Sequence, residues 1–211
     1  INLTQRCNLK CKHCYLFGGE WGNKDLDLIT IKRLIKDLKD KIFFVYLAGG
    51  EPLLHKNIIE IVRLFKKAGI YTSITTNGTL LTKRLAEKFR DLGINHIQIS
   101  LEGAKKKTND LIRGEGTYDK ILCGIKNSID AGIPTVIACT LSLLNVNEVY
   151  DLTRMIQKLG GKYIHLGFNQ PAGRGKSIYE KYDLFKDKRA IKKLLRDIER
   201  SRKKTKIDIS L

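Results

Sequence analysis

Three cysteines near the start of the chain, Cys7, Cys11 and Cys14, stand in C-x3-C-x2-C spacing. Thiolates are metal ligands, and three this close in sequence can converge on one metal centre. A closed zinc site or an ordinary 4Fe–4S ferredoxin site takes a fourth protein ligand, but Cys123 and Cys139 lie far along the chain. Three local ligands therefore predict a centre with one open coordination position, where a small molecule can bind and react.

The charge and the cysteine usage narrow the class of protein. The 211 residues carry 40 Lys and Arg against 22 Asp and Glu, a formal charge of +18. A chain this basic raises the question of a nucleic-acid partner, but the lysines are spread over most predicted helices, which indicates solvated helix faces. Five cysteines with three clustered argue against a disulfide framework and predict a cytoplasmic protein. No run of 18 apolar residues exists, so no membrane partner is expected, and the spread of the lysines argues against nucleic acid.

The length suits one domain with a substantial core. The chain begins at Ile1, and its single methionine is Met155. We therefore expect residues 1–211 to be one domain excised from a longer protein.

Strand-like and helical segments alternate along the chain. Apolar runs predict strands, and apolar residues at helical spacing predict helices. The expected strands cover residues 1–4, 42–48, 70–76, 96–101, 134–141 and 163–168, and a further one starts at 207. The expected helices cover residues 28–38, 58–65, 81–92, 118–131, 146–159 and 186–202, with a loop over 102–117. The run 42–48 is apolar throughout, which predicts a strand buried on both faces.

This alternation predicts a parallel α/β sheet, because parallel neighbours need a helical crossover. Six units are too few for a closed eight-stranded barrel, so an open six-stranded partial barrel or a doubly wound sheet remains. In both, the ligand site lies beyond the carboxyl ends of the strands. Polar residues and glycines gather at these ends: Gly49, Gly50, Glu51, Asn77, Ser100, Glu102, Thr140, Asn145 and Asn169.

The cysteine motif, with Tyr15 after its last cysteine, resembles the signature of the radical SAM superfamily. The resemblance implies that Cys7, Cys11 and Cys14 hold a 4Fe–4S cluster whose fourth iron is chelated by S-adenosylmethionine (SAM). An electron from a ferredoxin- or flavodoxin-type donor would then cleave SAM to a 5′-deoxyadenosyl radical that abstracts hydrogen from substrate. The resemblance also implies the open (β/α)6 partial TIM barrel, which is that family's fold.

Further segments match the same family. Gly49-Gly50-Glu51-Pro52 matches its GGEP element, which implies glycine backbone near the methionine amino group of SAM and Glu51 stabilising the local charge or turn. Ser100-Leu101-Glu102-Gly103 resembles a segment near the ribose and methionine of SAM. Arg113 resembles an arginine that pairs with the SAM carboxylate. The resemblance places His13 near the adenine, and we assign Asn77 to the same cosubstrate.

Ordinary structural roles remain open for these residues. Glu51 can cap the helix that follows it, and Arg113 can be a surface residue of a glycine-rich loop. No proton donor or acceptor for the substrate can be named. The residues expected to serve only the scaffold or the surface are His55, His96 and His165, with Cys123 and Cys139 as small core residues.

Pro171-Ala172-Gly173-Arg174-Gly175 resembles a P-x-G-R-G element of one branch of the superfamily. That branch includes maturases of ribosomal peptides, often with a SPASM-type C-terminal domain, and radical enzymes of haem biosynthesis. It implies a peptide or a tetrapyrrole side chain as substrate. No cysteine follows Cys139, so no auxiliary cluster is expected within these residues. The alternative from another class is a non-catalytic zinc- or nucleic-acid-binding protein that uses the three cysteines and His13.

Overall fold

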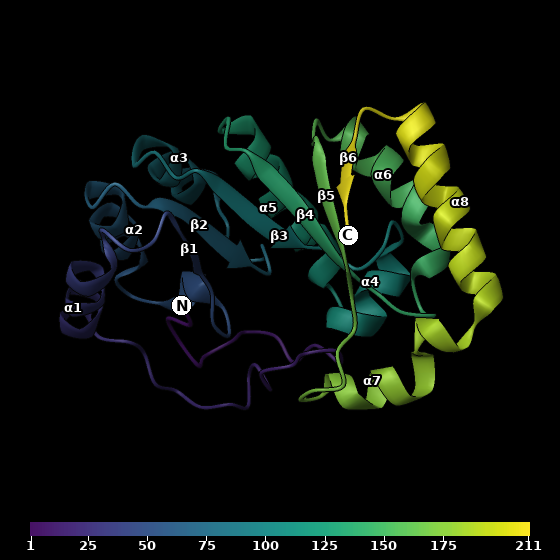
Figure 1. The fold of residues 1–211 in the computed structure, drawn as a ribbon, viewed down its shortest axis with the longest axis horizontal. Coiled ribbons are helices and arrows are strands. Elements are labelled where there is room, and N and C mark those ends of the chain that lie inside the picture. The colour runs from purple at the N-terminus through teal and green to yellow at the C-terminus, as the bar shows by residue number, and fades with distance from the viewer.

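The computed structural model describes all residues 1–211, and its centre is one parallel sheet whose six strands lie in sequence order (Figure 1). The strands are β1 (Phe44–Leu47), β2 (Tyr71–Thr76), β3 (His96–Ser100), β4 (Thr135–Leu141), β5 (Tyr163–Phe168) and β6 (Asp208–Ser210). Each crossover steps to the next strand in the same direction, as in a barrel, whereas a doubly wound sheet reverses its order at a switch point. With β1 and β6 as open edges, the sheet is the expected (β/α)6 partial barrel.

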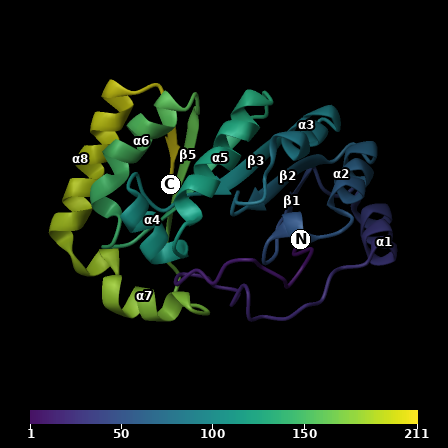
Figure 2. The same ribbon diagram turned by 180° about the vertical axis from the view of Figure 1, so that it is seen from behind.

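Helices cover only one face of this sheet. They are α1 (Leu28–Leu38), α2 (Ile58–Lys67), α3 (Lys83–Asp91), α4 (Lys106–Arg113), α5 (Thr117–Asp130), α6 (Val149–Lys158), α7 (Gly175–Tyr182) and α8 (Lys188–Lys204), with short 3-10 turns η1 (Pro52–Leu54), η2 (Val146–Glu148) and η3 (Leu184–Lys186). Figures 1 and 2 show α2, α3, α5 and α6 behind the strands and the other face bare. None of the helices combines the length and the apolar composition that a membrane span requires.

Side-chain caps set where several helices begin. The Asp27 carboxylate accepts from the backbone N–H of Thr30 at 2.8 Å, at the start of α1. Thr82 caps α3 and Asp187 caps α8 in the same way. A cap satisfies a backbone donor that has no partner within the helix, and it contributes about 1 kcal/mol. These caps fix the residue at which each of the three helices begins.

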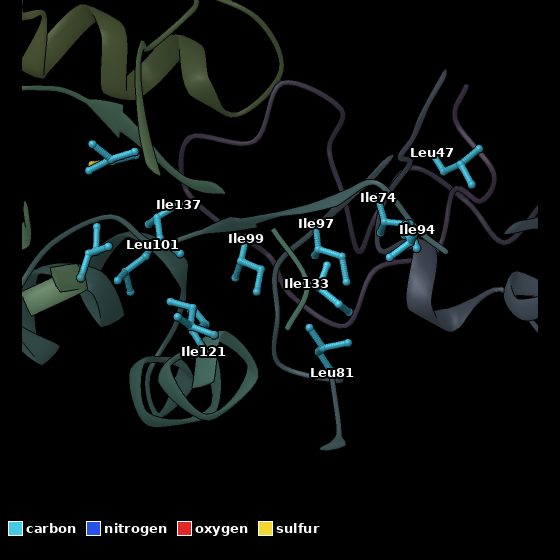
Figure 3. Close-up of a cluster of buried hydrophobic side chains, with 14 of the residues drawn as sticks. Leu47, Ile74, Leu81, Ile94, Ile97, Ile99, Leu101, Ile121, Ile133 and Ile137 are labelled. Atoms are coloured by element: carbon cyan, nitrogen blue, oxygen red, sulfur yellow. The ribbon is translucent and has the colours of Figure 1, made fainter. Parts of the chain in front are cut away.

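Alternate strand residues point towards the helices and form the core. In β4, Ile137, Cys139 and Leu141 are buried while the residues between them are partly exposed. Figure 3 shows Ile74, Ile97, Ile99 and Ile137 gathered with Ile121 of α5 and Leu81. Burial of each such side chain contributes about 1.5–3 kcal/mol. This apolar layer holds the helices to the sheet and so fixes the carboxyl ends of the strands in space.

The predicted set of six strands was wrong at its start. Residues 1–4 run beside the end of β1 but make only isolated bridges, Asn2 with Ala48 and Thr4 with Asp25. The chain continues beside the end of β1, where the N–H groups of Gly50 and Glu51 donate to the carbonyls of Thr4 and Arg6. These contacts lie beyond the last residue of β1 and form no continuous ladder, and Thr4 also bridges antiparallel to Asp25. The sixth strand is β6, in the segment that was expected only to start a further strand.

Other expectations also need correction. The region 102–117 contains α4, and α7 follows the Gly-Arg-Gly segment, where no helix was predicted. The strand expected to be buried on both faces is not, since Phe44 is 57% and Tyr46 44% exposed on the face without helices. Cys139 is buried as expected, but Cys123 is exposed on α5. A sequence pattern shows that a run is apolar, but it does not show whether anything covers the second face.

Candidate functional site

Residues 5–23, which we call the cysteine loop, contain no helix or strand. The loop passes beneath the carboxyl ends of the strands and beside α7, as the dark purple chain in Figure 1 shows. Its ends and middle are fixed by backbone hydrogen bonds to distant segments. The Glu51 N–H donates to the carbonyl of Arg6 at 2.7 Å, and the Lys12 N–H donates to the carbonyl of Ile112 at 2.8 Å. The position of the three thiols therefore depends on contacts from outside the loop.

Each thiol of the loop has a nitrogen donor beside it. The N–H of Leu9 lies 3.4 Å from Cys7 Sγ, and that of Gly18 lies 3.1 Å from Cys14 Sγ. Arg113 Nη1 lies 3.9 Å from Cys11 Sγ. Burial raises the pKa of Cys7 to about 11, and it also raises the pKa of Cys11. A bound metal reverses this, because coordination deprotonates a thiol outright, and the three donors then stabilise the thiolates.

The geometry does not build a closed single-ion site. The chain has no group of three or more His, Cys, Asp or Glu side chains placed to hold one metal ion. His13 Nε2 lies 3.3 Å from Glu102 Oε1, so the ring is paired with a carboxylate. In a four-iron cluster the thiolates need not meet at one point, because each binds its own iron. The donor set thus fits a three-cysteine 4Fe–4S cluster, and the pairing of His13 weighs against the zinc alternative.

The glycines of the GGEP segment bring the end of β1 against the chain that enters the cysteine loop. Gly49 has φ +142°, and a Cβ on Gly50 would lie 2.2 Å from the carbonyl oxygen of Arg6. The Gly50 N–H donates to the carbonyl of Thr4 at 2.8 Å. Only residues without side chains permit this approach. Here the close approach is made by residues 4–6 of the chain itself.

Glu51 is fully buried and joins η1 to the end of β2. Its carboxylate accepts from Thr76 Oγ1 at 2.6 Å, from the Asn77 N–H at 2.8 Å and from the Leu53 N–H at 3.1 Å. Burial raises the pKa of this carboxyl, against the effect of the three donors. Glu51 therefore caps the short helix that follows it, which is the structural role that the sequence left open for this residue.

Asn77 contacts the cysteine loop directly. Its Nδ2 donates to Asn8 Oδ1 at 2.9 Å, and Asn8 Nδ2 donates to Thr79 Oγ1 at 2.9 Å. Asn8 lies inside the C-x3-C spacing, and nothing in the sequence distinguishes it from a spacer residue. The end of β2 and the cysteine motif are thus joined by two side-chain amides.

Glu102, Arg113 and His13 form a buried charged group beside Cys11. Arg113 Nη2 and Nε donate to Glu102 Oε1 at 2.6 and 3.1 Å. Burial alone would raise the pKa of Glu102, but the charges of His13 and Arg113 and their hydrogen bonds outweigh it and hold that pKa at about 2. The Glu102 carboxylate is therefore ionised at neutral pH, and its charge fixes the Arg113 fork next to the Cys11 sulfur.

The segment after β4 supports this group. The Thr140 N–H donates to Glu102 Oε2 at 2.7 Å, and Asn145 Nδ2 donates to the carbonyl oxygens of Glu102 and Thr140, both at 2.9 Å. The sequence marks Thr140 and Asn145 only as polar residues after a strand. Their contact with Glu102 could not be found from spacing. Ser100, which is partly exposed, ends β3 two residues before Glu102.

The face without helices carries polar and aromatic side chains, among them His96 and His165, which the sequence analysis assigned to scaffold or surface. A cavity of about 520 Å³ is lined by Tyr46, Tyr71, His96, Tyr163 and His165, among others. His96 Nε2 lies 2.8 Å from Ser73 Oγ, and burial lowers the pKa of this histidine. No strand of the sheet contains a lysine or an arginine. In a chain with 40 such residues, this face is set apart by its lack of positive charge.

Residues 1–156 match the family model described as the radical SAM superfamily. The chain belongs to the radical SAM superfamily. The cofactors of this family are a 4Fe–4S cluster and SAM, and the three-cysteine donor set described above fits such a cluster.

Two relatives differ in their named activities. A probable GTP 3′,8-cyclase of Saccharolobus islandicus is 36% identical over 188 residues, which are 87% of this chain and 60% of that protein. An AdoMet-dependent heme synthase of Methanosarcina barkeri is 34% identical over 179 residues, which are 82% of this chain and 50% of that protein. The chain thus spans 60% or less of either relative. SuiB of Streptococcus suis, solved bound to SAM, matches 99% of this chain and 48% of its own with a TM-score of 0.82. At 19% identity that likeness shows the fold.

Proposed function

We propose that residues 1–211 are one radical SAM core domain that generates a 5′-deoxyadenosyl radical and directs it at a substrate C–H bond. When bound, the cluster supplies the electron that cleaves SAM. The observation that carries the proposal is the cysteine loop itself. It places three thiols at the carboxyl ends of a parallel sheet, each beside a nitrogen donor.

The residues proposed to contact SAM lie on both sides of this loop. Arg113 and Glu102 adjoin Cys11, and Asn77 adjoins Asn8. The guanidinium of Arg113 already donates to Glu102, so a SAM carboxylate that pairs with Arg113 would share this donor. His13 Nδ1 is buried without a partner, which leaves a polar atom for the cosubstrate. The full proposed set is His13, Gly49, Gly50, Glu51, Asn77, Ser100, Glu102 and Arg113.

For the substrate, the face without helices favours a peptide. Its tyrosines and histidines offer aromatic rings and neutral hydrogen-bonding groups, which suit an extended peptide. A nucleoside triphosphate or a tetrapyrrole propionate would take cationic partners, and the strands provide none. The solved structure of SuiB with its precursor peptide gives this substrate class a precedent on the same fold. A tetrapyrrole side chain is the second candidate, supported by the sequence similarity to the heme synthase.

The electron donor is proposed to be a small acidic protein of the ferredoxin or flavodoxin type. The formal charge of +18 would steer an acidic donor to the surface and raise its association rate. Such steering weakens as salt is added. The reduction rate with the protein donor should therefore fall with ionic strength, whereas reduction by dithionite should depend on salt much less.

The test is the formation of 5′-deoxyadenosine after anaerobic reconstitution with iron and sulfide. Dithionite and SAM are added, and the product is followed by chromatography. Cys11→Ala should abolish it, and Cys123→Ala is the matched control, because Cys123 is exposed on α5. Product that persists in Cys11→Ala, or a wild-type protein that holds zinc and forms none, would overturn the proposal.

The substrate class is tested in the same assay. A pool of random peptides, coproporphyrin and GTP are added separately to the active protein. The peptide proposal predicts that only the peptides raise the rate of 5′-deoxyadenosine formation above that with SAM alone. Stimulation by coproporphyrin or by GTP alone would transfer the assignment to a tetrapyrrole or to a nucleotide.

A further inference from the structure

The segment Gly173-Arg174-Gly175, which leads into α7 at Gly175, lies directly against the cysteine loop. Arg174 Nε donates to the carbonyl oxygen of Cys11 at 3.0 Å, and its Nη2 donates to that of Gly18 at 2.6 Å. The Arg174 backbone N–H donates to the carbonyl oxygen of Cys14 at 2.9 Å. One residue from the far side of the sheet thus meets three carbonyls of the loop, two of them belonging to cysteines of the motif.

The flanking glycines permit this approach. A Cβ on Gly173 would lie 2.5 Å from the carbonyl oxygen of Cys14, and the residue has φ +55°. A Cβ on Gly175 would lie 3.0 Å from the carbonyl oxygen of His13. The neighbours in both cases are backbone atoms, which cannot rotate away as a flexible side chain can. The segment is therefore shaped to the backbone of the loop, and a side chain at Gly173 would separate the two.

The guanidinium of Arg174 is oriented mainly by these carbonyls. Its Nη1 also pairs with Glu20 at 3.0 Å, but that carboxylate is about half exposed. Exposed ion pairs contribute little, whereas hydrogen bonds from a charged donor are among the stronger ones. The planar fork of arginine reaches two carbonyls at once, which a lysine ammonium on a single flexible stem cannot reproduce.

We propose that Arg174 is a positioning residue for the iron–sulfur cluster, holding the backbone that carries Cys11 and Cys14 in the conformation that binds iron. The inference rests on the proposed function, because it presupposes a cluster on the three cysteines. The loop has no regular secondary structure of its own, so the ligand geometry depends on partners such as this one. Residues that orient metal ligands from outside commonly change metal affinity roughly 10- to 100-fold when they are replaced.

The experiment compares Arg174→Gln with Arg196→Gln, a matched change at an exposed position on α8. Both proteins and the wild type are reconstituted anaerobically, and the rate at which iron passes to an added chelator is measured by absorbance. Arg174→Gln should release iron roughly 10- to 100-fold faster than wild type, and Arg196→Gln should release it at the wild-type rate. Arg174→Lys, which can reach only one carbonyl at a time, should fall between them.

Thermal unfolding of the cluster-free proteins separates positioning from general stability. The inference predicts similar melting temperatures for Arg174→Gln and Arg196→Gln, because every hydrogen bond of the Arg174 side chain goes to the cysteine loop, which has no helix or strand. Iron release from Arg174→Gln at the wild-type rate would overturn the inference, and so would faster release that simply follows a lowered melting temperature. A wild-type protein that takes up no iron would instead overturn the proposed function, so the two failures are distinguishable.

Discussion

Replacement of Glu102 by glutamine tests how much the buried charged group of Glu102, Arg113 and His13 stabilises the fold. Glutamine keeps the shape of the side chain, but it removes the charge that faces Arg113 and His13 and replaces one of the two acceptor oxygens by an NH2 donor. The folded carboxyl has a pKa of about 2 against an ordinary value of 4.5. At about 1.4 kcal/mol for each pH unit, this difference corresponds to about 3 kcal/mol of stability. The loss expected when one partner of a buried ion pair is removed, roughly 3–5 kcal/mol, agrees with it.

The pH dependence fixes the sign of this effect. Because the folded pKa lies below the unfolded one, the stabilisation is present above about pH 4.5 and is lost as the pH falls towards about 2. Urea denaturation of the cluster-free proteins at pH 7 should therefore show the full difference between wild type and Glu102→Gln, and a smaller one at about pH 3.5. Glu199→Gln, which removes an exposed partner of Lys203, should leave the midpoint unchanged. A cost for Glu102→Gln below about 1 kcal/mol, or one independent of pH, would refute the assigned ion pair.

Three other substitutions test two contacts near the site and one position of the hydrophobic core. Gly50→Ala places a Cβ 2.2 Å from the carbonyl oxygen of Arg6, so iron retained after reconstitution should fall roughly 10-fold, and an iron content equal to wild type would contradict this. Thr76→Val removes one donor from the buried Glu51 carboxylate and should cost about 1–3 kcal/mol in urea denaturation. Phe89→Ala empties a fully buried core position and should cost roughly 3–5 kcal/mol by the same measurement. A cost below 1 kcal/mol would mean that the core collapses around the gap.

Much of the fold follows from local patterns in the sequence. In β3, Ile97 and Ile99 alternate with polar residues. In α2 and α5, apolar residues recur at helical spacing. These signals are local because the side-chain period of a strand or helix is fixed by its backbone. The start of the sheet was not predictable in this way, since the sequence does not show that residues 1–4 meet only the end of β1 and make isolated bridges there.

In the functional site, too, local features could be predicted from the sequence and contacts between distant residues could not. The spacing of the three cysteines and the polar residues at strand ends could be read directly, because parallel strands bring their carboxyl ends to one edge. The pairing of Glu102 with Arg113, and of Arg174 with the carbonyls of the cysteine loop, could not. These contacts join residues up to 163 positions apart, and no local pattern records which distant side chain reaches which carbonyl. The open face was missed for the related reason that exposure is a property of the assembled sheet.

A cluster held by only three cysteines has an open iron at which SAM can bind, and electron paramagnetic resonance tests for this open position. The electron paramagnetic resonance spectrum of the reconstituted, dithionite-reduced protein is recorded with and without SAM. Binding of SAM at the open iron predicts a changed spectrum, in wild type and in Cys123→Ala alike. An iron–sulfur signal that SAM leaves unaltered at saturating concentration would contradict the open position and, with it, the account of the site.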